Sequence, residues 1–275
     1  MKAVCDICPR RCALMEGQVG FCRARANRAG KIVCENYGRV TSLALDPIEK
    51  KPLRRFYPES KILSVGSYGC NMDCDYCQNC EIARADQDSV RWEHISPDAL
   101  VTLAEAYRSQ GNIGLAFTYN EPLIGYEYVL DCAKLAKPQG LRIVLVTNGM
   151  ILPEPWGKLL PYVDAANIDL KAFSKEQYRA LGGDFEIVKS SIAQAYGKIH
   201  MELTTLIVPG WNDSEAEMRA ECEWIASIST AIPLHLSRFF PRHRMKNVAP
   251  TPVETVLRMA KIAKEYLTYV YTGNI

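Results

Sequence analysis

The chain has 275 residues, with 33 Lys and Arg against 31 Asp and Glu, so its net charge of +2 gives no global attraction for nucleic acid. Hydrophobic residues make up 48% and charged residues 23%, a globular composition that excludes disordered and fibrous classes. No uncharged apolar run is long enough to cross a bilayer, and the first residues lack the apolar core of a signal peptide. We therefore expect a cytoplasmic protein with neither membrane nor nucleic acid as partner.

Cysteine is the exception to this ordinary composition. The chain has 11 cysteines, eight of them between Cys5 and Cys77. One group comprises Cys5, Cys8, Cys12 and Cys22, and a second comprises Cys70, Cys74 and Cys77. Outside both groups lie Cys34, Cys80, Cys132 and Cys222. Short, ordered spacings in a reducing compartment favour metal ligands over disulfides.

The pattern of elements divides the chain near residue 60. Residues 1–60 lack regular alternation, which predicts a small Cys-rich metal-binding segment. In residues 61–275, apolar runs alternate with segments of helical period, as in βα units around a parallel sheet. The predicted strands are 62–67, 113–118, 142–147, 165–169, 200–207, 233–239 and, least regular, 269–271. The predicted helices are 97–109, 123–137, 154–160, 175–181, 186–196, 214–226 and 252–266.

Three of the predicted helices have a hydroxyl residue just before them. Ser96 and Thr251 each precede a proline, which is favoured at the first helical position, and Ser174 precedes the helix at 175–181. We therefore expect these three side chains to cap their helices.

Six or seven βα units fit an α/β fold of the partial (β/α)6-type TIM barrel, although a doubly wound sheet also places its chemistry at the carboxyl ends of strands. Polar motifs follow the first four predicted strands at that end. They are residues 70–80, Tyr119-Asn120-Glu121-Pro122, Asn148-Gly149 and Asp169-Leu170-Lys171.

The loop from Cys70 to Cys77 carries three thiols within eight residues, enough to bind three irons of a cubane 4Fe-4S cluster and leave the fourth iron open. This pattern resembles the radical S-adenosylmethionine (SAM) superfamily, whose Cys-x3-Cys-x2-Cys loop follows the first strand of a partial barrel. An aromatic residue precedes the third cysteine there, as Tyr76 does here. Without the resemblance, a zinc loop or free buried thiols fit equally well. Cys80 could be mistaken for a fourth ligand, but the superfamily leaves that position variable.

The resemblance extends to the residues that hold SAM. Glu121 matches the carboxylate of a Gly-Gly-Glu-Pro motif in glycyl-radical-enzyme activases, which receives the SAM ammonium, while Tyr119 and Asn120 replace both glycines. Thr147 and Asn148 resemble the third-strand Thr-Asn-Gly that lines the adenosine. By themselves, both motifs are also ordinary turns.

Later motifs continue the likeness. Asp169 and Lys171, which share a face of their strand, resemble an Asp-Leu-Lys motif that reaches the ribose and carboxylate of SAM; a salt-bridged strand end is the alternative. Residues 208–211 are similar to a Val-Pro-Gly-Trp turn beside the adenine. His235 and Arg238 lie where activases carry a histidine, but a strand histidine is more often a core residue.

Other segments resemble the radical SAM member of the AmmeMemoRadiSam group, which is similar to pyruvate formate-lyase-activating enzymes. They are residues 5–12, 16–23, 46–53, 56–58 and 269–274. The chain lacks the Asp-Gly-Pro-Gly segment that activases carry before the cluster loop, and it lacks the cysteine-containing tail of longer members, as a truncated or short form would.

The resemblance implies a 4Fe-4S cluster and SAM as cofactors, a low-potential donor such as flavodoxin or ferredoxin, and an unidentified substrate, which could be a protein. Cys5, Cys8, Cys12 and Cys22 are predicted to hold a second metal, zinc or an auxiliary iron–sulfur cluster, although free thiols or a site completed by Cys34 remain open.

Alternative functions are a glycyl-radical-enzyme activase and a non-catalytic zinc or electron-transfer protein. A basic run at residues 50–55 could dock an acidic donor or an anionic substrate, or be a solvated loop.

Overall fold

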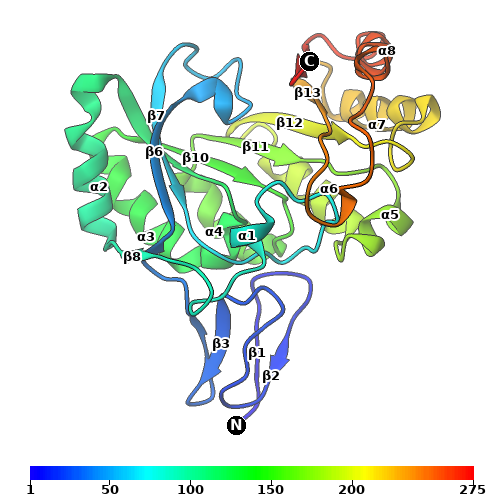
Figure 1. The fold of residues 1–275 in the computed structure, drawn as a ribbon. Helices are drawn as coiled ribbons and strands as arrows, with labels where there is room; N and C mark the ends of the chain where they lie inside the picture. The colour runs from blue at the N-terminus through cyan, green and yellow to red at the C-terminus, as the bar shows by residue number, and fades with distance from the viewer.

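The computed structural model describes residues 1–275 and contains one large, open, curved sheet of eight strands (Figure 1). Its strands, in chain order, are β6 (Ser42–Pro47), β7 (Lys61–Gly66), β9 (Asn112–Phe117), β10 (Arg142–Thr147), β11 (Ala165–Asp169), β12 (His200–Ile207), β13 (Leu234–Arg238) and β14 (Val270–Gly273). Strands β7 and β9 to β14 are parallel and lie side by side in chain order, whereas β6 is antiparallel to β7. A doubly wound sheet would reverse its strand order, so the predicted partial TIM barrel is confirmed.

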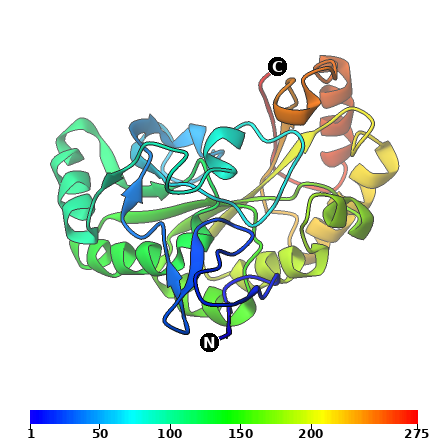
Figure 2. The ribbon, with the colours of Figure 1, turned by 60° about the horizontal axis from the view of Figure 1, so that its bottom comes forward.

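The helices lie around the sheet, as Figures 1 and 2 show. They are α1 (Cys80–Ala83), α2 (Pro97–Ala106), α3 (Tyr126–Ala136), α4 (Pro153–Leu159), α5 (Lys175–Ala180), α6 (Phe185–Ala195), α7 (Glu215–Ile228) and α8 (Val253–Ala263). Short 3-10 helices occupy Ile48–Lys50, Arg108–Gln110, Pro122–Gly125, Lys137–Gln139, Leu160–Tyr162 and His243–Met245. No helix is both long enough and apolar enough to span a membrane.

Two of the three predicted helix caps form. The hydroxyls of Ser96 and Ser174 accept hydrogen bonds from the amides of Ala99 and Gln177. The prediction for Thr251 is wrong: its hydroxyl donates to the Ile207 carbonyl at 2.6 Å and does not cap α8. Thr251 therefore ties the segment before α8 to the end of β12.

The segment between β6 and β7 fills the interior of the barrel. Ile48, Leu53 and Phe56 pack against inward-facing strand residues. Buried Glu202 on β12 accepts the backbone N–H groups of Arg54 and Arg55 at 3.0 and 2.8 Å, which holds the segment in place.

The basic run at residues 50–55 is therefore not a solvated loop throughout. Lys51 is only 2% exposed and pairs with Asp46 at 2.9 Å, while the neighbouring Lys50 is largely exposed and pairs with the same carboxylate.

The N-terminal segment consists of small antiparallel pairs: β1 (Ala3–Val4) with β2 (Ala13–Leu14), and β3 (Arg25–Arg28) with β4 (Lys31–Cys34). A third pair joins β5 (Arg39–Val40) to β8 (Glu93–His94). Because β6 belongs to the large sheet, the part outside that sheet ends near residue 41 and not near residue 60. The division into two domains stays a prediction.

Candidate functional site

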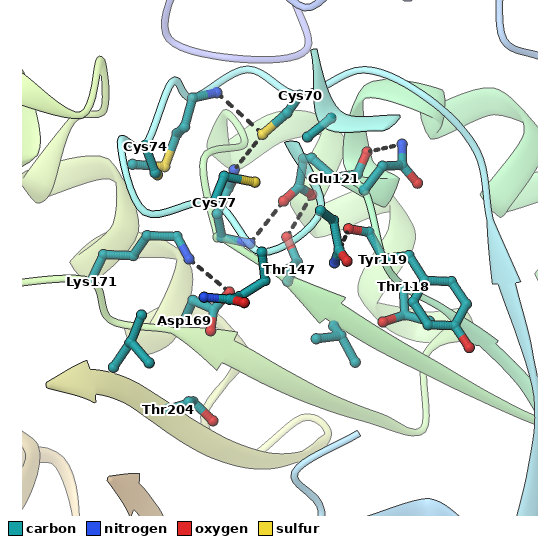
Figure 3. A pocket seen from close by; sticks show the side chains of 18 of the residues that line it. Cys70, Cys74, Cys77, Thr118, Tyr119, Glu121, Thr147, Asp169, Lys171 and Thr204 are labelled. Carbon is teal, nitrogen blue, oxygen red and sulfur yellow. Dashed lines mark hydrogen bonds and ion pairs between the residues drawn. The ribbon is translucent and has the colours of Figure 1, made fainter. Parts of the chain in front are cut away.

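A cavity of about 300 Å³ opens where the parallel strands end at their carboxyl side (Figure 3). Ten of the twelve residues predicted to contact cluster or SAM line it: Cys70, Cys74, Tyr76, Cys77, Asn120, Glu121, Thr147, Asn148, Asp169 and Lys171. They come from the cluster loop and from the ends of three neighbouring strands, β9, β10 and β11. The fold thus gathers side chains that are as far apart in sequence as Cys70 and Lys171.

The three thiols of the loop face this cavity together. Cys70 Sγ accepts hydrogen bonds from the Met72 amide at 3.4 Å and from Asn148 Nδ2 at 3.7 Å. Burial raises the pKa of the Cys74 thiol to about 12, although the nearby Lys171 ammonium opposes the shift. Three thiols on one wall and no further cysteine on the other walls suit a cluster that keeps one iron open. Cys80 begins α1 and does not line the cavity.

Glu121 is a buried carboxylate with no cationic partner among its bonds. It is 3% exposed and accepts hydrogen bonds from Thr147 Oγ1 at 2.7 Å, from the Asn148 amide at 2.8 Å and from the Leu123 amide at 2.9 Å. Burial raises the pKa of Glu121 to about 7 against the opposing effect of these bonds. A buried negative charge without a counterion favours a cationic ligand, so this wall fits the ammonium of SAM.

Asp169 and Lys171 form an ion pair on the adjacent wall, with Nζ 2.9 Å from Oδ2. Burial would lower the pKa of Lys171, but the Asp169 carboxylate and the Cys74 thiolate hold it well above its usual value. The pair therefore offers both a donor and an acceptor to a ligand in the cavity.

Tyr76 provides an independent sign that the cavity is built for a ligand. Its side chain is 4% exposed, and its hydroxyl has no hydrogen-bond partner. A buried unpaired hydroxyl costs about 1–3 kcal/mol, which a polar ligand in the cavity would offset. The residues present thus fit a 4Fe-4S cluster together with SAM.

His235 and Arg238 lie outside this cavity. His235 shares a face of β13 with Ser237, which does line the cavity, but sits one level deeper in the barrel, where Nε2 lies 2.6 Å from Glu202. Arg238 donates to the Thr251 carbonyl at 2.7 Å. The turn at residues 208–211 does not line the cavity either.

Sequence reasoning missed the wall formed by the last three strands. Thr204, Leu206, Ser237 and Asn274 line the cavity there. Asn274 ends the segment 269–274 that carries the family resemblance, but none of the four was predicted to contact the cofactors. The available signal was their place at the carboxyl ends of strands or just beyond.

The N-terminal cysteines converge behind the cluster loop. Cys5 and Cys12 flank the β1–β2 pair, and the Cys5 amide donates to the Cys12 carbonyl at 3.0 Å. Burial, then the nearby Cys8 and Cys5, raises the pKa of Cys22 to about 11. All four thiols are free. Neither these cysteines nor the Cys70 loop form a group of three or more ligands placed for one metal ion.

Comparison with known proteins agrees with this geometry. The model of the Radical SAM superfamily matches residues 64–222. The uncharacterized protein MJ0808 of Methanocaldococcus jannaschii is 38% identical over 278 residues, covering 100% of this chain and 82% of the relative. The putative glycyl-radical enzyme activating enzyme MJ1227 of the same organism is 28% identical, with 80% of this chain and 91% of the relative covered.

A solved structure shows the same fold. A radical SAM methyltransferase from Sphaerobacter thermophilus superposes with a TM-score of 0.58 at 15% identity, over 79% of this chain and 67% of that protein. This chain therefore belongs to the radical SAM superfamily, a family of enzymes that bind a 4Fe-4S cluster and SAM and cleave SAM reductively to start radical chemistry.

Proposed function

We propose that Cys70, Cys74 and Cys77 bind the 4Fe-4S cluster and that the cavity beside them binds SAM. When bound, the cluster supplies one electron to the sulfonium of SAM, and the 5'-deoxyadenosyl radical that forms abstracts a hydrogen atom from the substrate. The observation that carries the proposal is the convergence of three thiols, an unpaired buried carboxylate and the Asp169–Lys171 pair on one cavity.

The chain's own residues bind, orient and enclose the cofactor. Glu121 receives the SAM ammonium, and Thr147 and Asn148 hold that carboxylate in place through its two oxygens. Asp169 and Lys171 face the ribose and carboxylate. The buried Tyr76 hydroxyl lies in the same wall and is free to hydrogen-bond a polar group of the bound cofactor.

The test is anaerobic reconstitution with iron and sulfide, followed by SAM and dithionite, with 5'-deoxyadenosine as the measured product. Formation of 5'-deoxyadenosine that requires both SAM and reductant supports the proposal. Its absence from protein that contains a full cluster would contradict it. In this assay dithionite replaces the external low-potential donor of the proposed reaction, which is flavodoxin or ferredoxin.

A glycyl-radical-enzyme activase is the second candidate, favoured by the similarity to MJ1227. Tyr119 and Asn120 stand in place of the two glycines of the activase motif, and no Asp-Gly-Pro-Gly segment precedes the loop. An activase would generate a glycyl-radical EPR signal in a partner enzyme, whereas the general proposal requires no such partner.

A further inference from the structure

We propose that Cys5, Cys8, Cys12 and Cys22 bind a second 4Fe-4S cluster, through which the electron enters on its way to the cluster of the Cys70 loop. The role of this site as an electron relay rests on the proposed function, because the electron needs an acceptor at Cys70, Cys74 and Cys77. Whether these four cysteines bind a cluster at all does not depend on the proposed function.

The four cysteines are brought together by the local fold. The short β1–β2 pair places Cys5 opposite Cys12, and Cys8 lies in the connection between the two strands. The chain then returns over this pair, since a Cβ added at Gly20 would lie 3.7 Å from Cys12 Sγ. Four cysteine thiolates are the ligand set of both zinc sites and 4Fe-4S clusters.

The site adjoins both neighbours of Cys70. A Cβ added at Gly69, which has φ +89°, would lie 2.3 Å from the Cys22 carbonyl oxygen, so the two backbones are in direct contact. On the other side, the Asn71 side chain lies near the Cys8 thiol. A cysteine of the N-terminal group thus lies against each of the two residues that flank Cys70 in the chain.

Specific contacts hold the N-terminal segment in this place. Arg10 Nε donates to the Asn71 carbonyl at 2.7 Å, and the Leu152 amide donates to the Ile7 carbonyl at 2.9 Å. Arg25 is buried and forms a two-bond ion pair with Glu127 at 2.6 and 2.7 Å. Figure 1 shows the N-terminal strands projecting from the lower edge of the barrel, so these contacts join the segment to the barrel at its near end.

This placement favours iron over zinc. Zinc has no redox chemistry, so it would gain nothing from contact with the loop that must receive an electron. Held by these four cysteines, a 4Fe-4S cluster would take one electron from a reduced one-electron carrier and pass it to the cluster of the Cys70 loop, with no bond made or broken and no proton required. The contact of Cys22 with Gly69 would place such a cluster beside the loop of Cys70.

The charge of the segment indicates the class of carrier. Residues 1–34 contain seven Arg and Lys against two Asp and Glu, a net charge of +5 in a chain whose total is only +2. Arg25 is buried against Glu127 and Arg28 pairs with Glu35, whereas Lys2, Arg11, Arg23 and Lys31 are exposed. These four exposed cations would attract an acidic electron-carrier protein.

The experiment compares four forms of the full chain, reconstituted anaerobically. They are the wild type, the double variant Cys8→Ala/Cys12→Ala, the triple variant Cys70→Ala/Cys74→Ala/Cys77→Ala, and Cys132→Ala as a control for loss of a buried cysteine outside both groups. With two clusters we expect about eight irons per wild-type and control chain, about four in each multiple variant, and no zinc. The reduced triple variant should give a 4Fe-4S EPR signal that SAM does not alter.

Electron entry is measured as the rate at which a reduced flavodoxin reduces the SAM-responsive cluster in a stopped-flow experiment. We expect the double variant to be reduced at least tenfold more slowly than the wild type, and the control at the wild-type rate. One zinc per chain, no iron in the triple variant, or equal reduction rates in the double variant and wild type would overturn the proposal.

Failure of the proposed function would look different. In that case SAM would leave the EPR signal of the wild type unchanged, while the triple variant would still bind its own iron.

Discussion

At the scale of single residues, Tyr119 shows how the cavity departs from the activase pattern. Its φ is +71°, a left-handed conformation that a residue with a side chain adopts at a cost of about 1–3 kcal/mol. The phenol donates to Asp46 at 2.8 Å, and a Cβ added at Gly66 would lie 2.8 Å from the ring. The tyrosine therefore fills part of the barrel interior beneath the cavity, where a glycine would leave room.

The cysteines of the loop should not be equivalent. Alanine at Cys70, Cys74 or Cys77 is expected to abolish SAM cleavage because each removes a cluster ligand, whereas Cys80→Ala should leave cleavage largely intact. Iron content and 5'-deoxyadenosine formation are the measurements. If Cys80→Ala lost as much iron and as much 5'-deoxyadenosine formation as the other three variants, Cys80 would be a fourth ligand and no iron would be open.

Glu121→Gln should weaken SAM binding by about ten- to a hundredfold, the value of a buried charge-assisted hydrogen bond, without loss of iron. The pKa of Glu121 in the free protein is raised to about 7, and an ammonium ligand favours the ionised form. SAM affinity of the wild type should therefore rise roughly tenfold from about pH 6 to about pH 8. Equilibrium binding titrations across this pH range test both points. If the SAM affinity of Glu121→Gln still rose from about pH 6 to about pH 8, the Glu121 carboxyl would not be the group that binds the ammonium.

At the scale of elements, periodicity found all seven parallel strands but missed β6. The predicted strand at 142–147 matches β10 as observed, because buried parallel strands are continuously apolar. In β6, Asp46 points inward and binds Lys51, Ser64 and Tyr119, so polar side chains occupy positions where the pattern requires apolar ones. These partners exist only in the folded barrel, and local sequence therefore could not identify the strand.

The segment that fills the barrel interior should depend on Glu202. Burial alone would raise its pKa, but hydrogen bonds from His200, His235 and the Arg54 and Arg55 amides lower it to about 2. Because the folded pKa lies below the unfolded value, this stabilisation is present above about pH 4.5 and is lost as the pH falls towards about 2.

Glu202→Gln should therefore reduce the free energy of unfolding by about 2–3 kcal/mol near neutral pH, and by much less near pH 3. Urea denaturation at the two pH values measures the difference. Glu254→Gln, a change at the exposed start of α8, serves as the control. An equal loss at both pH values would show that the carboxylate charge does not hold this segment.

At the scale of the whole molecule, sequence motifs predicted the residues of the cavity better than they predicted the position of the N-terminal segment. Cys70 to Cys77, Glu121 and the Asp169–Lys171 pair follow strand ends, and parallel strands bring their ends to one edge. The position of the N-terminal segment depends instead on contacts between distant residues, such as the bond from Arg25 to the Ile124 carbonyl 99 positions away. Nothing in the local pattern of residues 1–41 encodes that position.

The positive N-terminal segment should govern how fast an acidic carrier reduces the protein. Arg11, exposed and next to Cys12, is a suitable site for charge reversal, and Lys198, exposed on the connection from α6 to β12, is the matched control. Because charge complementarity acts on encounter, Arg11→Glu should lower the second-order rate with reduced flavodoxin roughly fivefold at low salt, and added salt should shrink the difference. Lys198→Glu should match the wild type.

Stopped-flow reduction at two salt concentrations, with dithionite as a reductant that needs no docking surface, provides the measurement. Equal rates for Arg11→Glu and Lys198→Glu would place the docking surface elsewhere on the molecule.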